Sequence, residues 1–347
     1  MSTSQLIKDE ARRLGFALAG VTTPETPPHV SAYENWLRLG RHASMEYLAD
    51  ARGRACRQNP RLILPECHSI LVLGMCHADP KSVMAEGAAG LKGRVAAYAW
   101  GRDYHLVITE RLQKLAGFIE KLDDRAVPNR WYTDTGPILE RDLAQRAGLG
   151  WIGRNTCLIN PKLGSYFLLS EILLGIDLEP DLPFPADRCG TCKRCIEACP
   201  TGCILPDRTL DARRCISFLT IENKAEIPSD LRTKIGNWTF GCDICQMICP
   251  WNRFASQEYQ QDFTPQADLP NPNLKNAMLL TPQAFNRKFK DSPVQRARRR
   301  GYLRNVAVAL GNAGNSEGIP ALEGALKDNE PLIRQHAAWA LEQIRKD

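Results

Sequence analysis

The first 180 residues alternate between hydrophobic patterns of helical and of strand type. Apolar residues recur at helical spacing in three segments: 5–14, 104–122 and 138–147, the last ended by Gly148. Short apolar runs at 16–21 and 70–76 predict buried strands, whereas periodicity alone does not decide between strand and helix for 166–174. The alternation predicts a layered domain of mixed α and β structure, of the α/β or the α+β class, over residues 1–180.

The C-terminal part, residues 275–347, has a helical pattern with an internal repeat. The segments Leu303–Leu310 and Ile333–Leu341 align, with small or apolar residues at matching positions, and a third helical segment, Ile319–Leu326, lies between them. Paired helices with small residues in the second helix are typical of HEAT repeats. Because about two units cannot form a solenoid alone, we expect this segment to pack against the rest of the chain.

Thirteen cysteines are present, and nine of them lie between Cys189 and Cys249. The surrounding segment, residues 181–260, has too few apolar residues for a core of its own, and the odd count in a long chain argues against a disulfide scaffold. The run Cys189-x2-Cys192-x2-Cys195-x3-Cys199-Pro is the bacterial ferredoxin spacing, in which the fourth cysteine binds a different cluster. This predicts a ferredoxin-like domain with two [4Fe–4S] clusters.

A second cysteine group, Cys215 followed by Cys242, Cys245 and Cys249, completes the ligand sets. We assign the first cluster to Cys189, Cys192, Cys195 and Cys249, and the second to Cys199, Cys215, Cys242 and Cys245. Structural zinc is the alternative for Cys-x2-Cys pairs. Cys203 could replace Cys199, although a packed spectator thiol is favoured. The scattered Cys56, Cys67, Cys76 and Cys157 are interpreted as small buried hydrophobic residues.

The composition indicates an ordinary globular protein with a formal net charge of +6. No apolar run approaches the about 20 residues of a membrane span, and the polar N-terminus lacks an apolar signal core. We therefore expect a cytoplasmic protein with no membrane partner. The chain also lacks the Gly-x-Gly-x-x-Gly fingerprint of dinucleotide-binding folds.

Several longer motifs resemble the epoxyqueuosine reductase family: Tyr98–His105, Tyr132–Arg141, Gly150–Thr156, Asp211–Ser217 and Gly241–Trp251. The resemblance covers nearly the whole chain. It implies a cobalamin-dependent enzyme with two [4Fe–4S] clusters that reduces epoxyqueuosine to queuosine at the wobble position of tRNA, fed by an external electron donor such as a ferredoxin or flavodoxin system. It also implies a nitroreductase-like cobalamin domain over 1–180, like that of the related reductive dehalogenases.

The resemblance carries residue roles with it. Asp134 matches the family's proton donor, and a carboxyl group buried beside a cofactor is expected to have a raised pKa; the alternative is an Asx-turn. The implied cobalamin contacts are Arg57, Asp134, Asn155, Ser165, Ser217, Cys242 and Asp243. We expect Arg57 on an extended segment near a proline, with a solvated surface charge as its alternative role, while Asn155 could instead only cap a turn. Tyr98, Trp100, Tyr104 and His105 either wall the active site or pack in the core.

Residues 287–304 carry eight lysines or arginines against one acid, Asp291. A one-signed run beside the helical repeat predicts a face that binds tRNA phosphates, whereas a solvated helix surface is the alternative. The predicted tRNA-binding residues are Arg296, Arg298, Arg299, Arg300 and Arg304.

Two other functions are compatible with the cysteine pattern. A corrinoid reductive dehalogenase would share the clusters and the α/β layout, but the basic helical tail argues against it. A ferredoxin fused to a scaffold would need no 180-residue domain with the Asp134 motif.

Overall fold

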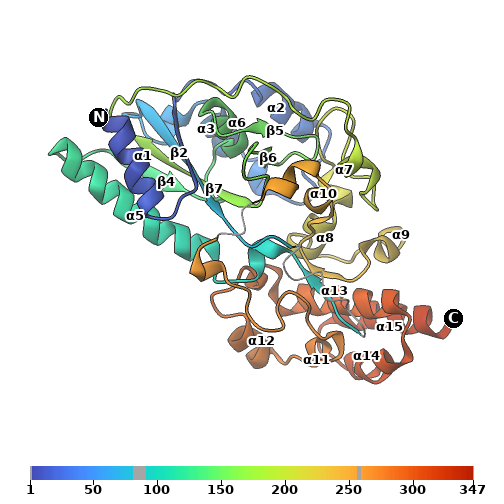
Figure 1. The fold of residues 1–347 in the computed structure, drawn as a ribbon. Coiled ribbons are helices and arrows are strands. Elements are labelled where there is room, and N and C mark those ends of the chain that lie inside the picture. Colours follow the sequence, from blue (N-terminus) through green and yellow to red (C-terminus); the bar gives the residue numbers. More distant parts are fainter. Residues whose placement is uncertain (1, 81–90, 256–258, 347) are drawn as a thin grey trace.

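The computed structural model describes residues 2–80, 91–255 and 259–346 (Figure 1). Its N-terminal part is built on a four-stranded antiparallel sheet with the strand order β1-β2-β7-β4. The strands are β1 (Leu18–Thr22), β2 (Ser69–Cys76), β7 (Phe167–Leu174) and β4 (Asn129–Tyr132). Both predicted strands are confirmed, and the undecided segment 166–174 is a strand.

Helices cover the two faces of this sheet. On one face, α1 (Thr3–Arg13) and α5 (Tyr104–Asp123) bury their apolar stripes against alternate residues of β2 and β7. On the other face, α6 (Glu140–Arg146) packs Leu143 and Ala144 against Val72 and Leu173. All three predicted helices are present, and Gly148, at φ +77°, ends the third. Because the strands are antiparallel, the domain belongs to the α+β side of the predicted mixed class.

Shorter elements connect this sheet to the rest of the domain. Two helices precede β2, namely α2 (Val30–Arg38) and α3 (Ala51–Gln58). A small antiparallel hairpin follows α6 and is formed by β5 (Trp151–Ile152) and β6 (Leu158–Ile159).

The cysteine-containing segment is joined to the N-terminal domain by a strand pair. Its elements are α7 (Arg194–Glu197), α8 (Ile216–Ile221), α9 (Ser229–Arg232), β8 (Trp238–Phe240) and α10 (Ile244–Met247). Strand β8 pairs in parallel with β3 (Arg94–Val95). An apolar cluster around Ile216, Leu231 and Trp238 also takes in Val308 of the C-terminal tail. The segment therefore has an apolar core, but shares it with the tail.

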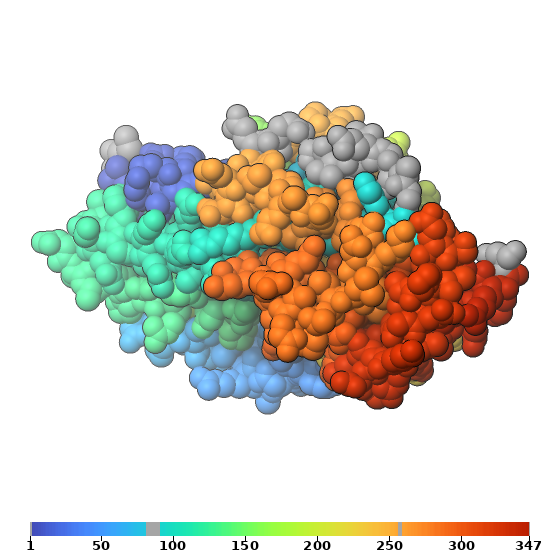
Figure 2. All heavy atoms as spheres, turned by 90° about the horizontal axis from the view of Figure 1, so that it is seen from below, coloured from blue at the N-terminus to red at the C-terminus, as the bar shows by residue number. Residues whose placement is uncertain are grey.

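The tail contains five helices: α11 (Leu274–Met278), α12 (Pro282–Lys288), α13 (Arg298–Ala313), α14 (Ile319–Ala325) and α15 (Pro331–Lys346). The repeated segments are α13 and α15, which lie against each other so closely that a Cβ atom on Gly311 would come within 2.8 Å of the Ala340 Cα. The tail core also contains Val95, Trp100 and Phe240, as expected for a repeat that packs on the rest of the chain (Figures 1 and 2). Within the described residues, no helix is both long and apolar enough to span a bilayer.

Candidate functional site

The two predicted cysteine sets are each brought together in the structure. Cys195, in α7, interacts electrostatically with Cys189, Cys249 and Cys192, so the four thiols of the first set lie together. Burial, followed by the neighbouring thiols of Cys189, Cys249 and Cys192, raises the pKa of Cys195 to about 11. In the second set, the pKa of Cys242 is raised by burial and by charges that include those of Cys215 and Cys199.

Two further thiols lie beside the second set. The Sγ atom of the buried Cys203 is 3.4 Å from that of Cys199. The Cys157 side chain hydrogen-bonds with the Cys245 thiol, and this lowers the pKa of Cys157. In the described residues, no group of three or more His, Cys, Asp or Glu side chains is arranged to hold a single metal ion. The four thiolates of a [4Fe–4S] cube bind four different irons, so they do not converge on one point.

Asp134 lies on the loop between β4 and α6, with its backbone in the left-handed region at φ +62°. Its carboxylate Oδ2 accepts a hydrogen bond of 2.8 Å from the Tyr104 hydroxyl, and the His105 Nε2 lies 3.8 Å from the same oxygen. The Tyr104 and His105 rings stack at 4.0 Å, and Asp103 holds the His105 Nδ1 at 2.8 Å. The Asp134 side chain therefore faces two donors and does not close an Asx-turn.

The pKa of Asp134 differs from the sequence-based expectation. Burial raises it, but the hydrogen bonds from His105 and Tyr104 outweigh that effect and hold it below its ordinary value. The Asp134 side chain is 66% accessible to water, so its neighbours desolvate it only in part. The expectation of a raised pKa is wrong because two donors face the carboxylate.

The protonated groups lie around Asp134. Burial lowers the pKa of His105, but its ion pairs with Asp103 and Asp134 outweigh this and raise it to about 9. The Glu140 Oε1 accepts a 2.7 Å hydrogen bond from the Asp134 backbone N–H, and burial together with the Asp134 charge raises the pKa of Glu140 to about 7. Glu171, in the middle of β7, is fully buried, and neither of its carboxyl oxygens has a hydrogen-bond partner among the described residues.

These neighbours include two acids that the sequence analysis did not single out. Burial, with the charges of Glu140 and Asp134, raises the pKa of Glu171 well above its ordinary value. A glutamate inside an otherwise apolar strand was the available sequence signal for Glu171. Glu140 had no signal, because its position at the start of a helix is common for acids.

The Asp134 site is linked to the cysteine segment through Tyr98 and Asp243. The buried Asp243 carboxylate accepts a 2.7 Å hydrogen bond from the Ala97 backbone N–H, and burial raises the pKa of Asp243 to about 7. Tyr98 packs edge-on against Tyr104 at 6.0 Å, and both Asp134 and Asp243 contribute to its raised pKa after burial. Trp100 is a core residue whose indole N–H donates to the Val95 carbonyl.

The remaining predicted cofactor contacts fall into two groups. The first group, Ser217 and Arg57, retains polar side-chain atoms that have no partner among the described residues. Ser217 is half-buried in α8, just after Cys215. The buried Arg57 Nη1 has no hydrogen-bond acceptor among the described residues. Arg57 lies in the last turn of α3 with its guanidinium over the Tyr33 ring, so the expected extended segment and solvated charge are both wrong. Asn155 and Ser165 are already bonded within the protein, to Cys157 N and to Gln246 and Asn252.

The predicted tRNA-binding arginines, named here the tail patch (Arg296, Arg298, Arg299, Arg300 and Arg304), differ in accessibility. Arg298 and Arg300 are exposed, and Arg296 forms an exposed ion pair with Glu222. Arg299 is held by Asp328 and the Leu280 carbonyl. Arg304 is fully buried and donates to backbone carbonyls of the cysteine segment, those of Leu219, Asn223 and Ala225.

The prediction that Arg304 contacts a tRNA phosphate directly is therefore wrong. The residue lies in the part of α13, 301–311, that is buried on all sides, where its guanidinium closes the interface between the tail and the cysteine segment. Charge density along a sequence does not reveal which face of a helix each arginine occupies.

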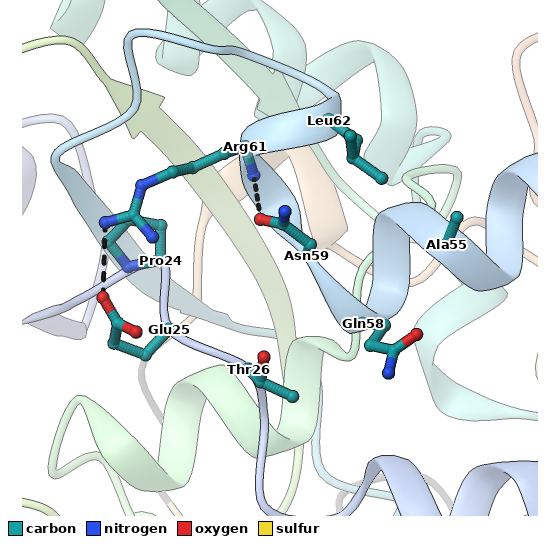
Figure 3. Close-up of a pocket in the computed structure, with 8 residues that line it drawn as sticks. All are labelled: Pro24, Glu25, Thr26, Ala55, Gln58, Asn59, Arg61 and Leu62. Carbon is teal, nitrogen blue, oxygen red and sulfur yellow. Dashed lines mark hydrogen bonds and ion pairs between the residues drawn. The ribbon is translucent and has the colours of Figure 1, made fainter.

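A surface pocket of about 460 Å³ lies apart from these residues (Figure 3). Its wall contains an ion pair between Arg61 and Glu25, and Asn59 accepts a hydrogen bond from the Arg61 N–H. None of the predicted site residues lines it. The depression therefore has no part in the chemistry around Asp134.

Comparison with known proteins decides the family. Family models match three segments: Epoxyqueuosine reductase QueG, DUF1730 over 57–135, a 4Fe-4S double cluster binding domain over 188–252, and HEAT repeats over 296–347. The chain is 42% identical to epoxyqueuosine reductase of Pseudomonas aeruginosa over 97% of its length and 93% of that protein. The chain belongs to the epoxyqueuosine reductase family. The Escherichia coli K12 member is 38% identical over 98% of this chain and 89% of its own.

Solved structures of the epoxyqueuosine reductase family agree with this assignment. A crystal structure of epoxyqueuosine reductase with an epoxyqueuosine-modified tRNA-Tyr stem loop has a TM-score of 0.89 and 31% identity, covering 99% of this chain and 91% of that one. The Bacillus subtilis enzyme, solved with its aspartate catalytic loop swung out of the active site, has a TM-score of 0.88 and 32% identity over the same shares. The matched family model favours iron–sulfur clusters over zinc, and the relatives leave the dehalogenase alternative without support.

Proposed function

We propose that this protein reduces epoxyqueuosine to queuosine at the wobble position of tRNA. The observation that carries the proposal is the carboxylate of Asp134, held between Tyr104 and His105 on the side of the N-terminal domain that meets the cysteine segment. Membership of the epoxyqueuosine reductase family supports the reaction class, and the stem-loop-bound relative supports tRNA as the substrate. The protein would then be an oxidoreductase of tRNA modification.

Removal of an epoxide oxygen as water, leaving an alkene, consumes two electrons and two protons. When bound, two [4Fe–4S] clusters and a cobalamin supply the single-electron chemistry that this reduction needs. The chain supports the assignment of the clusters to the two cysteine sets, because each set lies together in the fold. The proposed division is a nitroreductase-like cobalamin domain over 1–180, a cluster domain over 181–260 and a tRNA-binding tail over 275–347.

The chain's donor set is compatible with cobalamin. The corrin periphery carries amide groups and a phosphate, which bind to carboxylates, hydroxyls and guanidinium groups. Asp243, Ser217 and Arg57 supply these three types, and the buried Arg57 Nη1 still lacks an acceptor among the described residues. Cys242, beside Asp243, and Asp134 complete the proposed contacts. Asn155 and Ser165 would act instead by holding the loops of the two domains together.

The path of proton delivery follows from the pKa values of Asp134 and of the groups around it. Since the pKa of Asp134 is lowered while His105 has a pKa of about 9, His105 is the protonated partner at neutral pH. We infer that Asp134 passes a proton from His105 to the epoxide oxygen, and that Glu140, with a pKa of about 7, helps to reload the site. Tyr104 fixes the orientation of the carboxylate through its 2.8 Å hydrogen bond.

The substrate face would run from Asp134 towards the tail. Tyr47 interacts electrostatically with both Asp134 and Arg296, so the exposed end of the tail patch lies close to the reaction site. Within the described residues, Arg298 and Arg300 are exposed and form no ion pair, so they are suited to phosphates of the anticodon stem while the wobble base is unstacked into the site.

The test is an anaerobic assay of the cluster- and cobalamin-loaded protein with epoxyqueuosine-containing tRNA and a chemical reductant, read by mass spectrometry of the released nucleosides. Conversion to queuosine by the wild type, with a steep loss in Tyr104→Phe and Asp134→Asn, is the expected result. Unchanged epoxyqueuosine beside fully reduced clusters would exclude the proposed reaction.

A further inference from the structure

A second basic surface surrounds the first cysteine set and has no part in the proposed substrate face. We name it the cluster rim, and it consists of six exposed side chains: Arg188, Lys193, Arg194, Ile248, Arg253 and Phe254. The segments that carry them also carry all four thiols of the first set, namely Cys189, Cys192, Cys195 and Cys249. The Cys195 and Cys249 thiols are less deeply buried than the second-set thiols of Cys215, Cys242 and Cys245, so the first cluster would be the outer one of the two.

The four cations of the rim are free. In the described parts of the chain, none of Arg188, Lys193, Arg194 and Arg253 forms an ion pair with a carboxylate. The neighbouring Asp187 is paired with Arg208, which leaves Glu197 as the one uncompensated acid between residues 188 and 200. The side chains of the rim are therefore net positive, and within the described residues their cations have no carboxylate partner.

Aromatic side chains hold two of these cations in place. Arg188 lies over the Phe184 ring at 5.2 Å, and Arg253 lies over the Phe254 ring at 4.5 Å. A chain of ring contacts joins these two sites: Phe184 to Trp151 at 5.6 Å, Trp151 to Trp251 at 5.0 Å, and Trp251 to Phe254 at 6.0 Å. Arg188 and Arg253 thus lie on one continuous aromatic base, which orders them before any partner arrives.

Apolar side chains are exposed among these cations. Ile248, directly before Cys249, is 41% exposed, and Phe254 is 43% exposed. An apolar centre with a charged edge is the pattern of a protein-docking site, and basic residues at such an edge favour an acidic partner. Figure 1 shows α7 and α10 on the opposite side of α8 from the tail helices α11–α15, so these two elements of the rim lie away from the tail.

We propose that the cluster rim is the docking surface for a small acidic one-electron carrier protein. This inference rests on the proposed function, which requires an external electron donor. Electrons would enter through the first cysteine set, because Cys242 and Cys245 of the second set flank Asp243 deeper in the protein. The rim brings the carrier to the half-buried thiols of that set, and each encounter transfers one electron from the carrier to the outer cluster. Such contacts are small, short-lived and steered by charge, as a carrier that must leave after each electron requires.

The experiment reverses the charge of the rim. In the loaded protein, the double variant Lys193→Glu/Arg194→Glu is mixed anaerobically with a reduced acidic flavodoxin, and the bleaching of the iron–sulfur absorbance is followed by stopped flow. The second-order rate constant is expected to fall at least about tenfold at low salt and to lose most of its ionic-strength dependence. Binding of oxidised flavodoxin, measured by calorimetry, should weaken in parallel.

The matched control is Lys114→Glu/Lys121→Glu, which makes the same charge change on exposed positions of α5 and should leave the rate unchanged. Methyl viologen radical needs no docking, so its rate of cluster reduction should remain within about twofold of wild type in both double variants. A loss of that rate would mean a damaged cluster. The milder Lys193→Gln/Arg194→Gln variant would then replace the charge-reversed one.

Two results would overturn the docking proposal. One is an undiminished flavodoxin rate in the rim variant, and the other is a loss of tRNA affinity in place of carrier affinity, which would make the rim an RNA face. Failure of the proposed function would look different: the wild type would accept electrons at its normal rate but leave epoxyqueuosine unchanged.

Discussion

The tail patch and the cluster rim are both basic, but their arginines differ in how many are available to bind a partner. In the tail patch, Arg299 is bound to Asp328 and Arg304 is fully buried against backbone carbonyls, so two of its five arginines serve the fold. In the cluster rim, every cation is exposed and none pairs with a carboxylate of the described chain. A dense run of charge along the sequence thus overstates the charge available in space, because accessibility decides which cations can meet a partner.

The largest effect is expected from a variant that blocks the reaction at Asp134 and leaves both basic surfaces unchanged. Asp134→Asn keeps the shape of the side chain but removes the acidic group that faces Tyr104 and His105. We expect queuosine formation to fall by about 10²–10⁴-fold, because a positioned acid contributes about that much. Mass spectrometry of digested tRNA measures it. If tRNA affinity or the rate of cluster reduction fell as well, Asp134 would be acting through the structure and not as a proton donor.

A large effect on stability is expected from the buried end of the tail patch. Arg304→Leu removes a guanidinium that satisfies the carbonyls of Leu219, Asn223 and Ala225 and leaves these acceptors without donors. The free energy of unfolding, measured by urea denaturation, should decrease by about 3–5 kcal/mol, because each buried acceptor left without a donor costs about 1–3 kcal/mol. The exposed neighbour Arg300→Leu is the control and should change it by less than about 0.5 kcal/mol. A stable Arg304→Leu protein with weakened tRNA binding would show instead that Arg304 contacts the RNA.

The exposed end of the tail patch should affect binding and leave folding intact. Arg298→Glu/Arg300→Glu replaces its two free cations, so the Kd for the tRNA is expected to rise at least about tenfold. The slope of log K against log salt should become shallower by roughly 2, one for each lost phosphate contact. Filter binding across a salt series measures both quantities. An unchanged slope would show that phosphates are held elsewhere on the protein.

The smallest expected effect is on pH dependence. The pKa of His105 is raised in the folded protein to about 9, so its ion pairs with Asp103 and Asp134 are fully formed below about pH 6.5 and are lost as the pH rises through 9. Single-turnover rates should therefore decline above pH 9. In Glu140→Gln, a weaker inflection near pH 7 should disappear, because the pKa of Glu140 is about 7. A wild-type profile flat from pH 6 to 10 would contradict the proton path.

The elements with strong local signals were predictable from the sequence. Helices α1, α5 and α6, strands β1 and β2, and the repeat of α13 and α15 follow from hydrophobic spacing. The grouping of the cysteines follows from ferredoxin spacing. The class of β7 did not follow, because an apolar run of that length fits a strand or a buried helix equally well. Arg57 was misplaced because its short helix α3 has little apolar periodicity.

The electrostatics of the site were not predictable. The acidity of Asp134 depends on Tyr104 and His105, which approach it from α5, about thirty residues away in the sequence. Glu171 is raised by burial in the sheet, and only the strand register shows that it lies opposite Tyr132, beside the Asp134 loop. The cluster rim was missed because its cations come from two separated segments that only the aromatic contacts bring together.

In the proposed function, electrons and tRNA reach the Asp134 site from different faces, and the electrons reduce the tRNA's epoxyqueuosine there. The direct test is an anaerobic titration of the loaded protein and epoxyqueuosine-containing tRNA with limiting reduced flavodoxin, counting queuosine formed for each electron delivered. The account predicts one queuosine for every two electrons, with no product when Asp134 is asparagine. Oxidation of the flavodoxin without a matching yield of queuosine would contradict it.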